Sequence, residues 1–234
     1  MKIALNALSI GFTDGAQRSG TSRYAENLLR ALSRLDKKNE YLTLLHPAEK
    51  NHPLDLGDNF QRVDATWNTS SATARVLWEN SFANYPVKRF HPDLYHGFLN
   101  AHPYFLPCPT VVTIHDLAPF RVPEAYRVSR RWYQQHAIRR SVRASSLVLT
   151  PTQAIREEVI QRFHLPAEKT MATGEGVADF FSPLSPSAVE EWREKMGVPP
   201  RFFLFVGNLE PRKNLLALLE VFSAWRKRSS HKIP

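Results

Sequence analysis

His115 and Asp116 stand next to each other, directly after an apolar run that ends at Ile114. An imidazole can transfer a proton or hydrogen-bond a sugar hydroxyl, and a neighbouring carboxylate can fix its tautomer. A His-Asp pair also ends strands and caps turns without further function, so both interpretations stay open. His96 follows another apolar run, and neighbouring strands would bring it close to His115. A metal site made from these two histidines and His102 lacks any ligand spacing, and we expect none.

A glycine-containing loop precedes the first predicted helix and offers Gly20, Thr21, Ser22 and Arg23 as candidates. Free backbone N–H groups at a helix N-terminus attract phosphate or carboxylate, and Arg18 or Arg23 would add positive charge. The loop lacks the G-x-G-x-x-G spacing of dehydrogenase-type dinucleotide binding. A capped loop without a ligand is the structural alternative.

Arg212 and Lys213 follow an apolar run and Gly207, and Pro211 is expected to open a helix there. Two cations in the first turn of a helix oppose its dipole, which favours acids at that end. A diphosphate bound there would remove the conflict. We therefore predict that Gly207, Arg212 and Lys213 contact phosphate.

The chain carries a net charge of +9, which favours anionic partners without choosing among them. Residues 127–143 hold six arginines together with Trp132 and Tyr133. Arg139 falls beside Val128 and Trp132 on a helical wheel, which departs from a clean amphipathic membrane helix. A solvated basic face is the simpler interpretation, and peripheral contact with anionic lipid is the alternative. The scattered basic residues form no recognised nucleic-acid module, so no nucleic acid is expected.

Cys108 is the only cysteine among the 234 residues, which excludes an intrachain disulfide and a thiolate zinc cluster. A single cysteine fits a reducing compartment. The N-terminus does not have the pattern of a signal peptide, and no apolar run is long enough to cross a membrane. We expect a cytoplasmic protein, with peripheral contact to the inner face of a membrane as an option.

Short runs rich in Val, Ile, Leu and Phe alternate with longer helix-like segments, which predicts an α/β fold. The expected architecture is a Rossmann-like parallel sheet with helices on both faces, and ligands bind such sheets at the carboxyl ends of strands. Strands are predicted at residues 2–8, 41–46, 60–64, 94–96, 110–115, 147–150, 169–173 and 201–206. Helices are predicted at residues 22–35, 73–84, 124–143, 152–163, 186–196 and 211–227.

Three segments are predicted along the chain. Residues 1–180 form the first Rossmann-like domain, and 181–200, dense in Pro and Ser, form an interdomain linker. Residues 201–234 hold one strand and one helix, which bury too little apolar surface for a core of their own. This last segment is expected to be the start of a truncated second Rossmann-like domain.

Four motifs in this order resemble retaining glycosyltransferases of family 4, which have the GT-B architecture. They are GTSRY at 20–24, TIHDL at 113–117, GEGVADF at 174–180 and VGNLEPRKN at 206–214. The resemblance implies two facing Rossmann-like domains, with the acceptor bound mainly by the first and the nucleotide-sugar donor mainly by the second. It extends over essentially the whole chain.

The resemblance also implies roles for particular residues. His115 matches a histidine that contacts the donor sugar, and Asp116 follows it as a second catalytic candidate. Lys213, together with Arg212, matches the residues that hold the donor diphosphate, and the loop around Gly20 matches the loop on the phosphate and acceptor side. His96 is a further candidate on the acceptor side. No metal or other cofactor is expected, since cationic side chains and helix dipoles neutralise the leaving diphosphate.

Three positions depart from the family pattern. Ser22 stands where a second glycine is common, and Asn208 stands where many members have a phosphate-binding arginine. The E-x₇-E carboxylates that meet the donor sugar and ribose would lie beyond Pro234. The chain by itself is therefore expected to have weak activity or none.

We expect a retaining hexosyltransferase that uses a nucleotide-diphosphate sugar. Mannose is a family-level guess for the hexose. The acceptor is expected to be a glycan or a lipid-linked glycan in surface polysaccharide synthesis. The alternative is a non-catalytic Rossmann-like module that binds an anionic glycan, lipid or protein partner.

Overall fold

The computed structural model describes residues 1–10, 20–47, 54–69, 71–178, 181–207, 209–210 and 213–228. The chain divides into two compact units, Met1–Glu175 and Gly176–Pro234. The linker predicted at 181–200 falls inside the second unit and contains a helix.

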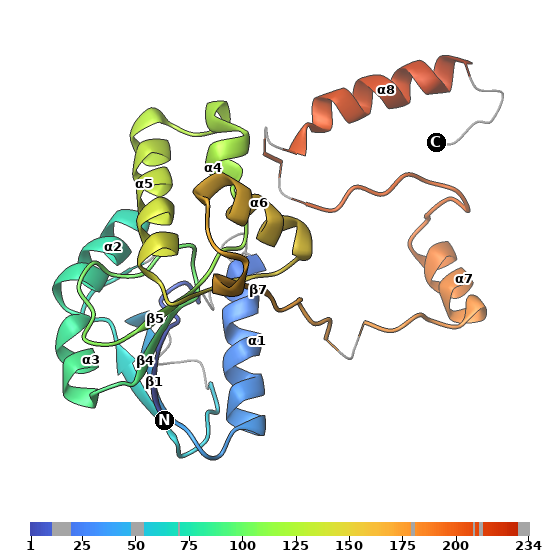
Figure 1. The fold of residues 1–234 in the computed structure, drawn as a ribbon. Helices are drawn as coiled ribbons and strands as arrows, with labels where there is room; N and C mark the ends of the chain where they lie inside the picture. Colours follow the sequence, from blue (N-terminus) through green and yellow to red (C-terminus); the bar gives the residue numbers. More distant parts are fainter. Residues whose placement is uncertain are drawn as a thin grey trace. The chain divides into compact units, whose positions relative to one another are not determined.

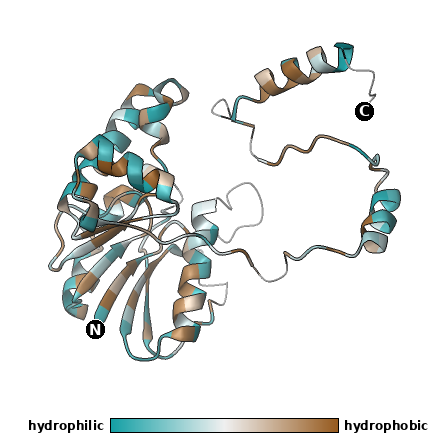
Figure 2. Ribbon diagram, turned by 45° about the vertical axis from the view of Figure 1, so that its right-hand side comes forward, coloured by the Kyte–Doolittle hydropathy of each residue, from teal (hydrophilic) through white to brown (hydrophobic). Residues whose placement is uncertain are grey.

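The first unit is built on a seven-stranded sheet in the order β3-β2-β1-β4-β5-β6-β7, and every neighbouring pair is parallel (Figure 1). This confirms the predicted Rossmann-like sheet. Hydrophobic residues lie along its strands (Figure 2), as expected of strands covered on both faces. The strands are β1 (Lys2–Asn6), β2 (Glu40–Leu45), β3 (Phe60–Asp64), β4 (Leu94–Gly97), β5 (Thr110–Thr113), β6 (Leu147–Thr150) and β7 (Thr170–Ala172).

Helices cover both faces of the sheet. Side chains alternate between the two faces along β1, so that Ala4 packs in the cluster with α2 and α3 while Leu5 packs in the cluster with α1. Helices α5 and α6 form a third cluster with β5 and β6. The helices of this unit are α1 (Gly20–Leu35), α2 (Ala72–Ser81), α3 (Asn84–Phe90), α4 (Ala118–Arg121), α5 (Val128–Ala144) and α6 (Gln153–Phe163).

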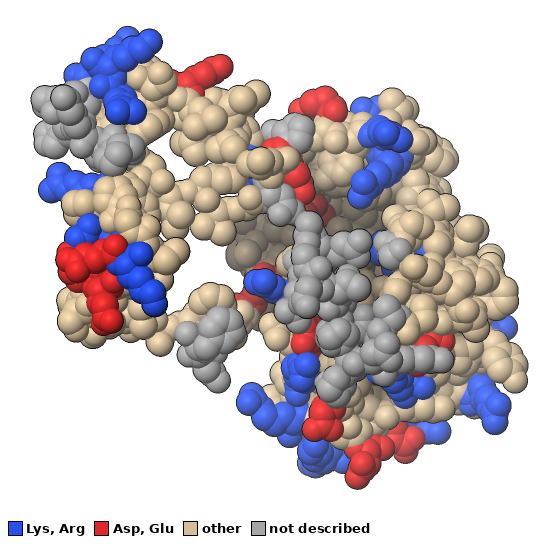
Figure 3. All heavy atoms as spheres, turned by 180° about the vertical axis from the view of Figure 1, so that it is seen from behind, with Lys and Arg blue, Asp and Glu red and all other residues tan. Residues whose placement is uncertain are grey.

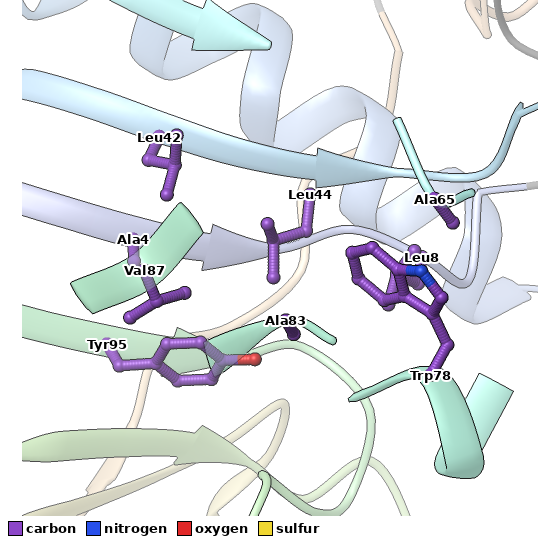
Figure 4. Close-up of a cluster of buried hydrophobic side chains, with 9 residues drawn as sticks. All are labelled: Ala4, Leu8, Leu42, Leu44, Ala65, Trp78, Ala83, Val87 and Tyr95. Carbon is purple, nitrogen blue, oxygen red and sulfur yellow. The ribbon is translucent and has the colours of Figure 1, made fainter. Parts of the chain in front are cut away.

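The cluster beneath α2 and α3 contains the largest buried side chains, Trp78 and Tyr95 (Figure 4). The Tyr95 ring lies along its strand, and its hydroxyl group is directed toward the end of the cluster at which Trp78 lies. Trp78 donates a hydrogen bond from its indole N–H to Thr66 Oγ1 at 3.0 Å. The polar ends of both large side chains therefore point toward the edge of the core.

Side-chain caps explain where two helices of the first unit begin. Ser71 and Thr152 cap α2 and α6 by accepting hydrogen bonds from the N–H groups of Ala74 and Ile155. The single helix predicted at 73–84 is two helices, since α2 ends at Ser81 and α3 begins at Asn84. Helix α5 begins at Val128 rather than at 124, because the residues before it form the short 3₁₀ turn Pro123–Ala125.

The loop after β4 turns back toward its own strand at Gly97. A Cβ atom at Gly97 would lie 2.6 Å from the carbonyl oxygen of Ala101, so that only glycine fits without a shift of the backbone. Asn100 adopts a left-handed conformation with φ of 51°, and its N–H donates to the Thr113 carbonyl at 2.9 Å. The loop from β4 is thereby fixed against the end of β5.

The second unit contains α7 (Pro186–Lys195) and α8 (Leu215–Arg228). Residues 201–206 are not a strand, and that prediction is wrong: the described part of this unit offers no neighbouring strand to pair with. Phe203 instead packs against Phe222 and Trp225 of α8, with ring centroids 5.3 Å and 5.6 Å away. Helix α8 begins at Leu215 and not at Pro211.

Replacing Gly97 with Ala is expected to lower the free energy of unfolding by about 1–3 kcal/mol, because the new methyl group forces the β4 loop away from Ala101. Chemical denaturation of the purified chain measures this change. Gly20→Ala is the matched control, since a Cβ at Gly20 meets nothing within 4 Å. Equal effects of the two substitutions would contradict the close approach at Gly97.

Candidate functional site

A cluster of polar and aromatic side chains lies at the carboxyl ends of β4 and β5, on the face of the sheet that α1 covers. His96 and Thr113 come from the two strands, His115 follows β5, and Tyr24 comes from α1. The Tyr24 ring meets the His115 ring edge-on at 4.7 Å, and Tyr24 Oη lies 3.3 Å from Thr113 Oγ1. The expected proximity of the two histidines is confirmed, since both rings border this cluster.

His115 is held from two sides by the β4 loop. Its backbone N–H donates to Asn100 Oδ1 at 2.8 Å, and its ring Nε2 lies 2.8 Å from the carbonyl oxygen of Phe98. A carbonyl oxygen can only accept, so Nε2 carries the proton of the neutral ring. The other ring nitrogen, Nδ1, then presents a lone pair.

Nδ1 of His115 lies 3.7 Å from Glu175 Oε1, at the end of the first unit. The His115 side chain is 9% exposed and that of Glu175 is 51% exposed. With the ring in this tautomer, Nδ1 can accept a hydrogen bond from a hydroxyl group that reaches it. The role of His115 toward a sugar stays a prediction.

Asp116 does not fix the tautomer of His115. Its Oδ1 accepts a hydrogen bond from the N–H of Ala118 at 3.0 Å, at the start of α4. The carbonyl of Phe98 sets the tautomer instead. The expected role of Asp116 in orienting His115 was therefore wrong, because the side chain of a residue that follows a strand can close the next turn.

His96 belongs to the same cluster as His115. Its Nε2 is 2.9 Å from Thr113 Oγ1, the same oxygen that Tyr24 contacts. Burial, reinforced by the nearby His115, lowers the pKa of His96 to about 3. His96 is therefore neutral at physiological pH and positions Thr113. These contacts do not support its predicted role on the acceptor side.

The loop residues Gly20, Thr21, Ser22 and Arg23 form the first turn of α1, directly before Tyr24. Gly20 and Arg23 are exposed, whereas Ser22 is buried at 2% exposure. The Ser22 side chain therefore faces the interior, and the predicted ligand contact of this loop through its backbone N–H groups stays a prediction. Arg18 lies outside the described residues.

The predicted phosphate-binding residues belong to the second unit. Gly207 and Lys213 are exposed, and Gly207 has φ of 156°. Lys213 lies in a short 3₁₀ turn and precedes α8 by two residues. Arg212 lies outside the described residues. Phosphate binding at these three positions stays a prediction.

Two carboxylates near the carboxyl ends of the strands were not predicted as site residues from the sequence. Glu175 sits in the glycine-rich motif after β7, and only the fold brings it to His115. Glu79 lies in the last turn of α2 and accepts a hydrogen bond from Asn6 Nδ2 at 3.1 Å. The one sequence signal for it was Asn6, a polar residue at the end of a buried strand.

Within the described ranges, no group of three or more His, Cys, Asp or Glu side chains is placed to hold a metal ion. None of the helices described has the length and apolar character needed to cross a bilayer. Basic side chains are dispersed over the face of the first unit seen in Figure 3, with acidic side chains among them.

The sequence model of Glycosyltransferase Family 4 matches residues 18–179. The chain is 29% identical to O-antigen chain mannosyltransferase B of Escherichia coli over 113 residues, which are 48% of this chain and 30% of that protein. It is 26% identical to serotype-specific mannosyltransferase WbdA of Escherichia coli over 122 residues, which are 50% of this chain and 15% of that protein. The matched segments thus span less than a third of each relative.

The fold is similar to that of Anabaena Alr3699/HepE, crystallised with UDP and glucose. The TM-score is 0.51 at 17% identity, over 88% of this chain and 54% of that chain. The likeness supports the GT-B type of Rossmann-like domain. Because the family model matches more than half of its residues, the chain belongs to glycosyltransferase family 4.

Lowering the pH is expected to destabilise the protein through His96. The unfolded chain binds a proton at His96 near pH 6.5, whereas the folded chain does not until about pH 3, so stability falls as the pH drops below 6.5. The loss from this group is about 2 kcal/mol between pH 7 and pH 5. Urea denaturation of wild type and His96→Gln at both pH values measures it. A pH dependence that is the same in both proteins would contradict the neutral His96.

Proposed function

We propose that this chain supplies the acceptor-side domain of a retaining glycosyltransferase that transfers a hexose from a nucleotide-diphosphate sugar. The observation that carries the proposal is His115, held with Nδ1 toward the edge of the sheet in a chain of family 4. A sugar hydroxyl that donates to Nδ1 would be fixed in place by a ring that Phe98, Asn100 and Tyr24 hold rigid. The role of the domain is orientation of the reacting sugar.

The similar proteins support a choice of substrates. Two relatives named as mannosyltransferases favour mannose as the hexose, and one of them acts on O-antigen chains. The crystal of Anabaena HepE with UDP and glucose favours a nucleotide-linked donor. We infer a glycan or lipid-linked acceptor of surface polysaccharide synthesis, and a cytoplasmic enzyme.

The donor diphosphate is assigned to Gly207, Arg212 and Lys213. Cationic side chains at the leaving diphosphate stabilise the charge that develops in the transition state, so that the reaction needs no metal ion. The E-x₇-E carboxylates of the family are not among the 234 residues. We therefore expect little or no transfer by the purified chain, and sugar transfer by these 234 residues alone would overturn that part of the proposal.

Replacing His115 with Ala in the native gene is expected to lower hexose transfer by about tenfold or more, because the hydrogen bond from the sugar hydroxyl to Nδ1 is lost. The measurement is incorporation of labelled mannose from its nucleotide sugar by extracts of the source organism.

His91→Asn is the matched control, since His91 is an exposed histidine at the end of α3 and Asn tolerates its left-handed backbone. Unchanged transfer in the His115 variant would remove the residue from the site. Equal transfer with and without the gene would favour the alternative, a non-catalytic module that binds an anionic glycan, lipid or protein.

The N-terminal half of α5 supports a peripheral membrane contact. Val128 and Trp132 lie one turn apart and are 70% and 69% exposed. The helix contains five arginines and no acidic residue, and Arg127 directly precedes it. Arg139, whose place on the helical wheel argued against a membrane surface, packs over Phe120 at 5.1 Å. Exposed apolar side chains among arginines fit an anionic bilayer.

Vesicles of phosphatidylcholine with 30% phosphatidylglycerol are expected to bind the chain, and pure phosphatidylcholine vesicles to bind it weakly. Replacing Arg130 and Arg131 with Gln should weaken binding about fivefold per arginine. Trp132→Ser should also weaken it, whereas Trp192→Ser, at a half-exposed tryptophan of α7, should not. Co-sedimentation measures each partition coefficient. Equal binding to both vesicle types would argue against this contact.

A further inference from the structure

A second polar cluster lies at the carboxyl end of β1, on the face of the sheet opposite the His115 cluster. Asn6, the last residue of β1, is 6% exposed. Its Oδ1 accepts the N–H of Leu8 at 3.3 Å, and its Nδ2 donates to Glu79 Oε1 at 3.1 Å. The strand end thus fixes the carboxylate of a residue from α2.

The contacts of Glu79 with other described residues are made by one carboxylate oxygen, Oε1. Arg75 Nε lies 3.9 Å from Oε1, the atom that Asn6 also contacts. Among the residues that the structure describes, Oε2 accepts no hydrogen bond. The side chain is 14% exposed, so that Oε2 faces a site largely shielded from water.

One hydrogen bond and a distant cation compensate only poorly for the hydration that a shielded carboxylate loses. Burial raises the pKa of Glu79, and Arg75 and then Asn6 oppose this only in part. Removing an ionised carboxylate from water is costly unless donors replace the lost hydration. The site is therefore short of hydrogen-bond donors, and sugar hydroxyl groups are donors.

Two tyrosines lie near enough to Glu79 for its charge to raise their pKa. Tyr95 Oη is fully buried beside it, and burial and then the charge of Glu79 raise the pKa of Tyr95 well above its usual value. Burial raises the pKa of Tyr133 to about 12, and the charge of Glu79 adds to this effect from across the gap between α2 and α5. Glu79 of α2 therefore interacts with residues from β1, β4 and α5.

The position relative to His115 makes this cluster relevant to transfer. Asn6 pairs with Gly97 of the neighbouring strand, and the carbonyl of Phe98, the next residue, holds the His115 ring. The two clusters are thus separated by a single strand at one edge of the sheet. A ligand bound at that edge can meet both.

We propose that Glu79 Oε2 binds a hydroxyl group of the acceptor, and that Arg75 and Tyr133 flank the same sugar. The inference rests on the proposed function, since it assigns the acceptor subsite of that transferase. The negative charge of Glu79 selects a neutral sugar terminus over a phosphorylated one. Glu79 is a binding residue and takes no part in a covalent step.

The test is saturation-transfer NMR on the purified 234-residue chain with methyl α-mannoside as the probe. Wild type is expected to transfer saturation to the probe, and Glu79→Gln to lower the affinity by about tenfold or more, because an amide replaces the charged acceptor. Glu158→Gln is the matched control. Glu158 is an equally shielded helical carboxylate, 18% exposed, that pairs with Arg121 and Arg162 on α4 and α6.

A second measurement avoids any loss of folding in the variant. The side-chain carboxyl ¹³C signal of Glu79 in the wild-type chain is expected to shift on addition of the probe, while that of Glu158 stays in place. No saturation transfer in wild type, or full retention of binding by Glu79→Gln, would overturn the assignment. A loss equal to that in Glu158→Gln would overturn it as well.

Failure of this inference is distinguishable from failure of the proposed function. If His115→Ala lowers sugar transfer in extracts while Glu79→Gln leaves probe binding intact, only the acceptor subsite is wrong. If the extracts transfer no hexose through this gene while Glu79→Gln abolishes probe binding, the chain binds a neutral sugar without the proposed transfer.

Discussion

The hold of the β4 loop on His115 is the interaction on which the site depends. The loop can reach the end of β5 only because Gly97 has no side chain where Ala101 returns. Asn100 Oδ1 then accepts a hydrogen bond from the backbone N–H of His115, and the Phe98 carbonyl oxygen accepts one from the ring Nε2. These bonds fix both the position and the tautomer of the imidazole before any ligand arrives, so little reorganisation is left for binding.

The alternation of side chains along parallel strands explains why two polar clusters lie at one edge. Asn6 and Tyr95 point to the face covered by α2, whereas His96, the next residue after Tyr95, points to the face covered by α1. Each face therefore presents its own polar groups above its own hydrophobic core.

Burial has different consequences for the ionisable groups of the two clusters. Burial lowers the pKa of His96 and keeps the ring neutral. His96 contacts Thr113 Oγ1, the oxygen that Tyr24 also contacts. Glu79 is shielded as well, but Asn6 and Arg75 offset part of the penalty on its charge. An imidazole nitrogen with a lone pair and a carboxylate oxygen both accept hydrogen bonds, which suits a ligand rich in hydroxyl donors.

The amino-acid sequence determined the architecture and the edge at which the site lies. Alternating apolar runs and amphipathic segments specify a parallel sheet, and a polar residue after such a run, as at His115, marks its carboxyl end. The sequence did not predict that residues 73–84 form two helices, because helix ends depend on packing. It also did not predict that residues 201–206 form no strand, because a strand needs a partner. Only the tertiary structure shows that Nε2 of His115 is the nitrogen bonded to the Phe98 carbonyl and that Asp116 closes a turn. It also shows that Glu175 and Glu79 lie near the carboxyl ends of the strands. These facts rest on contacts between residues far apart in the chain, and no local pattern encodes such contacts.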